Sequence, residues 1–224
     1  MKKLLCWLAL TAGYGSTEAQ NCKGTLLERQ GYRVCYVDSL GRPAWVAWSL
    51  KTSDIGTAER QSYFTSDKRL PEQFYRVTPR DYKGSGFDKG HLCSSADRTK
   101  SSRLNQETFA MSNVFPQSPN SNRITWRGLE EFCRGLAKKG YELKIVAGVY
   151  GSGGTGQQGP KKKLRGRVSV PSNAYKVVKY SMHGITHYIF ADMPNIQNLS
   201  RDWQDYQTTR ENLEEATGLS FENF

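Results

Sequence analysis

The chain has 224 residues, of which 37% are hydrophobic, and this is enough for one domain with a substantial core. Its formal net charge of +11 and pI near 9.5 suggest a polyanionic partner, although simple solubility would explain the charge equally well. No apolar run is long enough to span a bilayer and no internal repeat is visible, which excludes a membrane-spanning or repeat protein.

The N-terminal segment has the features of a secretory signal. Lys2 and Lys3 provide the positive start, residues 4–12 are a short apolar run, and residues 17–19 offer a small-residue cleavage site. We therefore expect residues 1–19 to be a signal peptide and residues 20–224 to form a single domain. The mature protein should be secreted or periplasmic.

Four cysteines remain in the mature chain: Cys22, Cys35, Cys93 and Cys133. An even number in an exported protein suggests two disulfides, for which three pairings are possible. We favour Cys22–Cys35, which would fasten the N-terminal segment, together with Cys93–Cys133. The alternative, a cysteine-rich zinc site, has no CxxC spacing to support it.

The first half of the chain predicts a hairpin followed by a long connection. Strand-forming residues flank a turn at residues 40–43, so the hairpin should cover residues 31–50. Residues 51–90 are polar and irregular, and long connections of this kind are more often functional than idle. Residues 108–114 resemble a short buried strand that ends at Pro116.

The strongest helix signal covers Thr125 to Lys139, with Gly140 placed to end it. Its apolar residues recur at helical spacing on one face: Trp126, Leu129, Phe132, Cys133 and Leu136. Downstream, three strands and a last helix are predicted over residues 143–149, 174–180, 186–191 and 209–216. The first of these strands is apolar throughout, which indicates a central position in the sheet.

A glycine-rich segment, residues 151–159, precedes a basic cluster. The cluster consists of Lys161, Lys162, Lys163, Arg165 and Arg167. We expect a mobile basic loop here, whose charges could contact a phosphate backbone or could simply be solvated. His183 and His187 have a spacing that would suit zinc on a helix, but Gly184 and the strand-forming residues 188–190 indicate a strand and turn instead.

Candidate catalytic chemistry begins at His91, because a histidine is a suitable general base near neutral pH. Gly90 before it indicates a backbone conformation that a side chain would obstruct. Asn122 offers a neutral oxygen ligand suited to Mg²⁺ when phosphate oxygens and waters complete the shell. Glu130, two helical turns later, can hold a metal-bound water.

Three cations near these residues can neutralise a phosphate. Lys89 is two residues from His91, Arg60 is in the upstream connection, and Arg134 shares a helix face with Glu130. Each could stabilise charge that develops on the phosphate oxygens. For Glu130 and Arg134 the alternative is an ordinary surface ion pair.

Together these residues form a pattern. Asp88-Lys89-Gly90-His91 is followed by Asn122, Trp126, Glu130 and Arg134, with three residues between successive members of the second group. This pattern resembles that of the DNA/RNA non-specific endonucleases, the ββα-metal nucleases that include endonuclease G and secreted bacterial enzymes. The similarity extends from about Trp45 to Phe221. One departure is Lys89, where the family usually has an arginine, and a lysine lacks the bidentate fork.

The resemblance implies an α+β fold: a mixed, mostly antiparallel central sheet flanked by helices, with a ββα-metal unit formed by the His91 region and the following helix. It also implies roles. His91 activates water, Asn122 is the protein ligand of one Mg²⁺, Glu130 orients that ion's water shell, and Arg60 and Arg134 bind phosphate.

The expected function is therefore a secreted Mg²⁺-dependent endonuclease that cuts DNA and RNA and leaves 5′-phosphate ends. Mn²⁺ is a possible substitute for Mg²⁺. No membrane partner is expected. Some relatives dimerise and others bind an inhibitor protein, and the sequence favours neither. The alternative function is a catalytically inactive basic module that binds nucleic acid or another polyanion.

Overall fold

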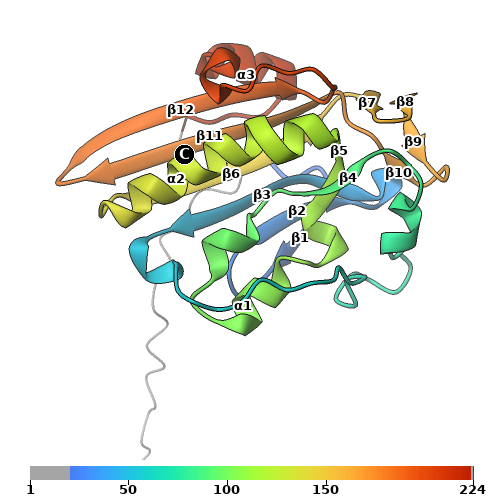
Figure 1. Ribbon diagram of the computed structural model, residues 1–224, viewed down its shortest axis with the longest axis horizontal. Coiled ribbons are helices and arrows are strands. Elements are labelled where there is room, and N and C mark those ends of the chain that lie inside the picture. Colours follow the sequence, from blue (N-terminus) through green and yellow to red (C-terminus); the bar gives the residue numbers. More distant parts are fainter. Residues whose placement is uncertain (1–20, 223) are drawn as a thin grey trace, which may run out of the picture.

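The computed structural model describes residues 21–222 and residue 224, so the expected signal peptide lies outside the described residues. A six-stranded antiparallel sheet runs through the molecule in the order β1-β2-β3-β6-β11-β12 (Figure 1). Its strands are β1 (Thr25–Glu28), β2 (Arg33–Val37), β3 (Arg42–Leu50), β6 (Glu142–Tyr150), β11 (Asn173–Met182) and β12 (Ile185–Pro194). The predicted α+β class is confirmed.

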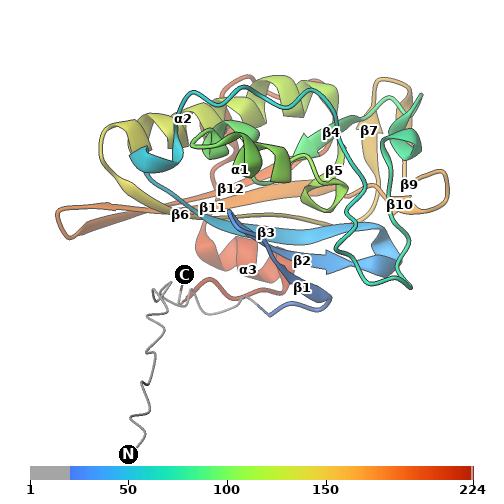
Figure 2. The same cartoon turned by 90° about the horizontal axis from the view of Figure 1, so that it is seen from below.

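Both faces of this sheet are covered. Helices α1 (Ser102–Glu107) and α2 (Arg127–Lys138) lie on one face together with the strands β4 and β5, whereas α3 (Arg210–Thr217) lies on the other (Figure 2). The side chains of successive β6 residues point alternately to the two faces of the sheet. Ile145 packs in the core on the α2 side, and Val146 packs in the core that contains Leu213 of α3. This double burial explains why the strand is apolar throughout.

The predicted hairpin, the central strand, the β11–β12 pair and the last helix are all confirmed. The chain turns between β2 and β3 through a single 3₁₀ turn, Asp38–Leu40, followed by Gly41 with a φ of 61°. At the N-terminus of α3 the Thr209 hydroxyl accepts a hydrogen bond from the backbone N–H of Asn212, and Gly218 ends the helix in the left-handed region.

Helix α2 begins later than predicted, because a π-helical segment, Ser121–Trp126, precedes it. Leu129, Cys133 and Ala137 are buried on its inner face, whereas Phe132 is 39% exposed. The Phe132 ring instead packs against Trp203, with a centroid distance of 5.1 Å. The apolar stripe is therefore narrower than the sequence indicated.

The strand predicted for residues 108–114 is wrong. Residues 111–113 form a 3₁₀ turn, and the strand β5 covers Val114–Gln117. The buried side chain of Asn113 explains the difference, since its Nδ2 donates to the carbonyls of Cys93 and Thr108 and its Oδ1 accepts from the Cys93 N–H. These bonds satisfy buried backbone groups that a strand ladder would otherwise have to satisfy.

The segment predicted to be a mobile basic loop has regular structure instead. It contains four short strands in two antiparallel pairs: β7 (Gly154–Gly156), β8 (Gly159–Lys161), β9 (Lys163–Leu164) and β10 (Val168–Ser169). Leu164, Val168 and Val170 are fully buried, and this apolar set attaches the segment to the core. Spaced single apolar residues in a basic stretch gave too weak a pattern to predict these strands.

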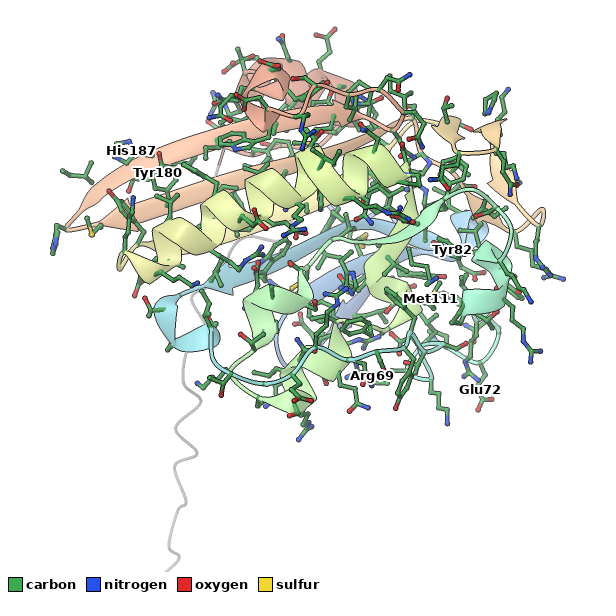
Figure 3. The ribbon with its side chains drawn as sticks, viewed as in Figure 1. Arg69, Glu72, Tyr82, Met111, Tyr180 and His187 are labelled. Atoms are coloured by element: carbon green, nitrogen blue, oxygen red, sulfur yellow. A yellow bond between two sulfur atoms is a disulfide. The ribbon has the colours of Figure 1, made fainter. Side chains whose placement is uncertain are left out.

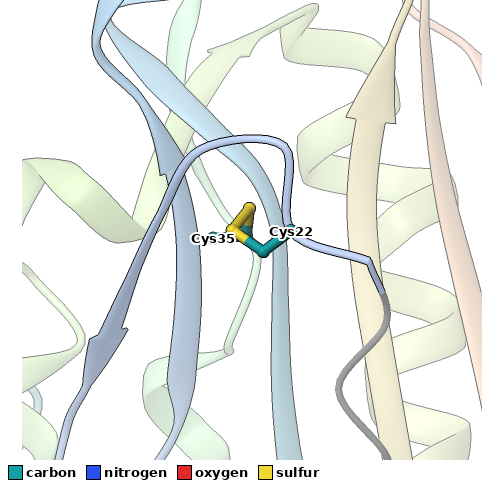
Figure 4. Close-up of a disulfide and its surroundings, with 2 residues drawn as sticks. All are labelled: Cys22 and Cys35. Atoms are coloured by element: carbon teal, nitrogen blue, oxygen red, sulfur yellow. A yellow bond between two sulfur atoms is a disulfide. The ribbon is translucent and has the colours of Figure 1, made fainter.

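One of the two predicted disulfides is present. Cys22 and Cys35 are bonded and fasten the N-terminal segment to β2 (Figure 4). The Cys93–Cys133 pairing is wrong, because both are free thiols. Burial raises the pKa of each thiol to about 12, so the two behave as small apolar core residues.

The two downstream histidines lie on the β11–β12 hairpin, as the strand-and-turn interpretation predicted. His183 occupies the turn, and His187 on β12 stacks on Tyr180 of β11 with centroids 5.1 Å apart (Figure 3). None of the helices in the described residues has the length and hydropathy needed to cross a membrane.

Candidate active site

The residues around His91 form a small ββα unit on one face of the large sheet. Strand β4 (Asp88–His91) pairs antiparallel with β5, which places His91 opposite Val114. The Trp126 indole Nε1–H donates to the His91 carbonyl at 3.2 Å and joins the start of α2 to β4. The expected ββα arrangement is therefore present.

Gly90 is required by close packing. A Cβ atom at this position would lie 2.0 Å from the Oε1 atom of Gln117 on the partner strand, and the Gln117 side chain is fully buried. A side chain at residue 90 would thus push the two strands apart. The sequence correctly indicated an obstructed position, although the cause is the neighbouring side chain and not an unusual backbone angle.

His91 packs against two aromatic rings, Phe64 and Phe109, which also contact each other with centroids 5.0 Å apart. Its ring centroid lies 5.0 Å from that of Phe64 and 4.8 Å from that of Phe109, and only 8% of the residue is exposed. Burial, assisted by the positive charge of Arg60, lowers the pKa of His91 to about 3. The imidazole is therefore neutral at physiological pH, as a general base must be. Its Nε2 atom is buried without a hydrogen-bond partner in the described chain.

Asn122 lies in the π-helical segment, and π-helical turns are frequent at functional sites. Its Nδ2 donates to Asp88 Oδ2 at 2.9 Å. Arg123 binds the same carboxylate in a bidentate manner, with both N–O distances at 2.8 Å. Because the amide nitrogen is engaged by Asp88, the Oδ1 atom of Asn122 is left as a ligand atom.

Glu130 and Arg134 lie one turn apart on α2 and share a polar network. The Ser94 hydroxyl donates to Glu130 Oε2 at 3.0 Å, and Arg134 Nη1 lies 3.0 Å from Asp97 Oδ1 and 3.8 Å from Glu130 Oε2. The Glu130 and Arg134 side chains are only 13% and 14% exposed. The alternative of a surface ion pair is therefore wrong for these two residues, because both are largely enclosed.

Lys176 lies beneath this network. The residue is 1% exposed on β11, and its Nζ lies 4.2 Å from the centroid of the Trp126 ring and 5.9 Å from that of the Trp48 ring. Burial raises the pKa of Glu130, and the positive charge of Lys176 is the largest influence that opposes this rise. Lys176, whose ammonium group makes a buried cation–π contact with Trp126, thus places a positive charge near Glu130.

The two remaining predicted cations, Arg60 and Lys89, each contact one of the rings that pack against His91. The Arg60 guanidinium contacts the Ser95 hydroxyl and lies 4.9 Å from the Phe109 ring centroid. Lys89 Nζ lies 5.2 Å from the Phe64 ring centroid. Both cations therefore contact the same two rings that pack against His91, and neither forms an ion pair with an acidic side chain of the described chain.

Comparison with known proteins gives the family. The model of the DNA/RNA non-specific endonuclease family matches residues 14–223. The chain belongs to this family. A nuclease from Nostoc is 43% identical over 205 residues, which are 88% of the chain and 72% of that protein. Nuclease C1 of Cunninghamella echinulata is 32% identical, with 87% of the chain and 81% of that protein covered.

Relatives of lower sequence identity are also nucleases. Human mitochondrial endonuclease G is 27% identical over 206 residues, which are 88% of the chain and 69% of that protein. A crystal structure of an EndoG/EndoGI complex superposes with a TM-score of 0.78 at 26% identity, covering 88% of this chain and 85% of that one. The chain is thus a nuclease with the endonuclease G fold.

Within this endonuclease, several residues of the site were not predicted from the sequence. Asp88 was visible as the first letter of the motif, but its partner Asn122 is 34 positions away, so no role followed from spacing. Other members reach the site only through the fold: Phe64, Ser94, Asp97, Phe109 and Lys176. One sequence signal could have identified Lys176. It is a lysine at a strand position whose neighbours on the same face, Ala174 and Val178, are apolar and pack in the core on the α2 side.

Proposed function

We propose that the chain is an exported, Mg²⁺-dependent endonuclease that hydrolyses both DNA and RNA with little base preference and leaves 5′-phosphate and 3′-hydroxyl ends. The single observation that carries this proposal is the hydrogen bond from Asn122 Nδ2 to Asp88. It fixes the amide so that a neutral oxygen remains as a ligand atom, close to the strand that ends in the base His91.

The donor set suits a hard divalent cation. In the described part of the chain, no three histidine, cysteine or acidic side chains gather into a metal site. A single amide oxygen is sufficient for Mg²⁺ when phosphate oxygens and waters fill the other positions. When bound by Asn122, the ion would act as a Lewis acid on the scissile phosphate. We assign Glu130 to orient its water shell, since this carboxylate is held by Ser94.

His91 acts as the general base in this proposal. Burial against Phe64 and Phe109 keeps the ring neutral and restricts its orientation. Because Nε2 is enclosed, we place proton abstraction from water at Nδ1. The Trp126–His91 bond holds the base in register with α2, and therefore with Asn122 and Glu130.

The cations stabilise charge that develops on the phosphate. Arg60 and Lys89 contact the rings that pack against the base, and neither forms an ion pair in the part of the chain that is described. Arg134 differs, because its Nη1 is engaged by Asp97 and Ser94. We assign its remaining N–H groups to the leaving side of the phosphate, with Asp97 fixing the orientation of the guanidinium.

Export is supported by the Cys22–Cys35 bond, since disulfides persist in oxidising compartments. Contacts made chiefly to phosphate would account for low base preference, because phosphates carry no sequence information.

The test is digestion of supercoiled plasmid and of total RNA by the mature chain, with Mg²⁺, with Mn²⁺ or with EDTA. We expect metal-dependent cleavage of both substrates. The variants His91→Ala and Asn122→Ala should each lose about 10²–10⁴-fold in rate. His187→Ala, which removes a surface histidine far along the β11–β12 hairpin, is the matched control and should retain full activity. Undiminished cleavage by His91→Ala would refute the assignment of the base.

A wild-type chain that binds DNA but cleaves neither substrate with any divalent metal would favour the inactive polyanion-binding module instead. End-labelling of the products separates the remaining outcomes. A 5′-phosphate at the new ends is expected, whereas a 3′-phosphate would show that the opposite bond of the phosphodiester breaks.

A further inference from the structure

We propose that a basic surface beside the active site binds the backbone phosphates of a long polynucleotide at a distance from the bond that is cut. This inference rests on the proposed function and extends it to how the enzyme recognises a polymer. The surface, here called the basic platform, is defined by five side chains of the β7–β10 segment: Lys161, Lys162, Lys163, Arg165 and Arg167.

The platform is packed directly against the ββα unit. Strands β7 to β10 lie beside β4 and β5 in both views (Figures 1 and 2). The buried Leu164 and Val168 share one apolar cluster with Phe87, which precedes β4, and with Val114, which begins β5. The exposed cations of the segment are thus carried on the same small core that supports the His91 strand.

A close backbone contact fixes the segment to the loop that leads into β4. The Gln157 N–H donates to the Gly86 carbonyl at 2.9 Å, two residues before Asp88. A Cβ on Gly86 would lie 2.7 Å from the Gln158 nitrogen, and a Cβ on Gly156 would lie 2.6 Å from the Gly86 oxygen. Glycine is therefore needed on both sides of the contact.

A second attachment runs through Asn195, which is 1% exposed. Its Nδ2 donates to the carbonyls of Pro116 and Pro171 at 2.9 Å each, and its Oδ1 accepts from the Ser118 N–H at 2.7 Å. Its own carbonyl accepts from the N–H of Thr155 in β7. One buried side chain thus ties the platform to the end of β5, where the chain turns into the segment that carries Asn122.

The platform charges are unneutralised. Lys162, Lys163, Arg165 and Arg167 are exposed, and no acidic side chain of residues 21–222 lies within ion-pair distance of them. The arginines at the start of α2 and before it differ, since Arg123 is paired with Asp88 and Arg127 with Glu131. A fixed group of like charges repels itself, and a polyanion spread across the group would relieve that repulsion.

A polynucleotide fits this surface better than an anionic membrane does. Proteins that lie on membranes insert apolar side chains next to their cations. The large hydrophobic side chains that are exposed in the described chain all belong to segments outside β7–β10: Leu26, Tyr63, Phe132, Ile185, Tyr188 and Ile196. The platform offers charge alone, which is the chemistry of backbone contact without base readout.

The experiment measures binding in the full mature chain carrying His91→Ala, so that cleavage does not interfere. Fluorescence anisotropy with a labelled duplex of about 30 base pairs, titrated at several salt concentrations, compares two double variants. Lys162→Gln/Lys163→Gln removes two platform charges. Lys138→Gln/Lys139→Gln is the matched control, because it removes another adjacent pair of exposed lysines, at the far end of α2.

We expect the platform variant to flatten the slope of log affinity against log salt by about 1.8, and to weaken binding at 0.1 M salt by roughly tenfold or more. The control should change the slope by much less. Thermal melts of both variants establish that each is folded. Equal losses in the two variants would overturn the proposal in favour of diffuse surface charge, and no loss in the platform variant would overturn it outright.

The last measurement is binding of the same variants to vesicles containing phosphatidylserine. Binding to vesicles that depends on Lys162 and Lys163, without any such dependence for the duplex, would assign the platform to a membrane and also overturn the proposal. Because binding is scored separately from cleavage, the result is distinguishable from failure of the proposed function. That failure would appear as an inactive wild-type chain, whatever the platform binds.

Discussion

Burial of His91 makes the stability of the protein sensitive to acid in a way that can be calculated. The pKa of His91 is about 3 in the folded state and 6.5 for a free histidine. Below pH 6.5 the unfolded chain therefore takes up a proton that the folded protein excludes. The stability linked to the neutral ring is fully present above pH 6.5 and is lost progressively as the pH falls toward 3.

At pH 4.5, two units below the free value, the loss amounts to about 3 kcal/mol. For a protein of this size, that corresponds to a fall in Tm of roughly 5–10 °C. His91→Ala removes the titrating group and leaves a cavity beside Phe64 and Phe109, whose cost does not depend on pH. The stability difference between wild type and variant should therefore be largest at neutral pH and shrink by about 3 kcal/mol at pH 4.5.

The assay is urea denaturation followed by circular dichroism, for both proteins at pH 7.5 and pH 4.5. Every other titrating group is common to the two proteins, so the difference isolates His91. Parallel loss of stability in wild type and variant would refute the reasoning, since it would mean that His91 takes up a proton equally well in the folded and unfolded states.

Three further changes test other parts of the structure. Gly90→Ala should cost about 1–3 kcal/mol by overpacking and lower plasmid cleavage at least tenfold; unchanged melting would contradict the close packing. Cys22→Ser/Cys35→Ser should lower the free energy of unfolding by about 3 kcal/mol, and dithiothreitol should have the same effect on the wild type but none on the variant. Lys176→Met should lower the free energy of unfolding by about 3–5 kcal/mol, because it removes the cation that compensates the enclosed Glu130 carboxylate, and it should move the acid limb of the pH–rate profile to higher pH, because Glu130 loses the charge that opposes its protonation. An unmoved limb would show that Lys176 has no such influence.

The sequence predicts well those parts of the molecule that repeat a local pattern. Strands β2, β3, β6, β11 and β12 of the large sheet and the helices α2 and α3 were predicted from such patterns, whereas the short edge strand β1 was not. That the strand Asp88–His91 and helix α2 meet was implied by the resemblance of the motif to that of the non-specific endonucleases. Spacing alone predicts only that Trp126, Glu130 and Arg134 lie near one another on the same helix.

Other features depend on partners that are remote in the chain. Asn113 replaces strand bonds with side-chain bonds, so residues 108–114 look like a strand but do not form one. Cys93 and Cys133 lie in the same core without being bonded. The number of cysteines in a sequence does not show which of them form a disulfide. The rings that pack against His91 come from Phe64, in the irregular connection, and Phe109, in the segment wrongly predicted as a strand, so neither pattern indicated the contact.

The pairing of Asn122 with Asp88 also limits which side chains the ligand position accepts. An aspartate at residue 122 would offer the same oxygen, and in an isolated site it would bind a cation more tightly. Here the second oxygen of the aspartate would replace the amide nitrogen, which lies 2.9 Å from Asp88 Oδ2. Two carboxylates so close cannot both remain ionised. One of them would hold a proton in competition with the cation. The amide is thus matched to its neighbour, and the two residues should change together or not at all.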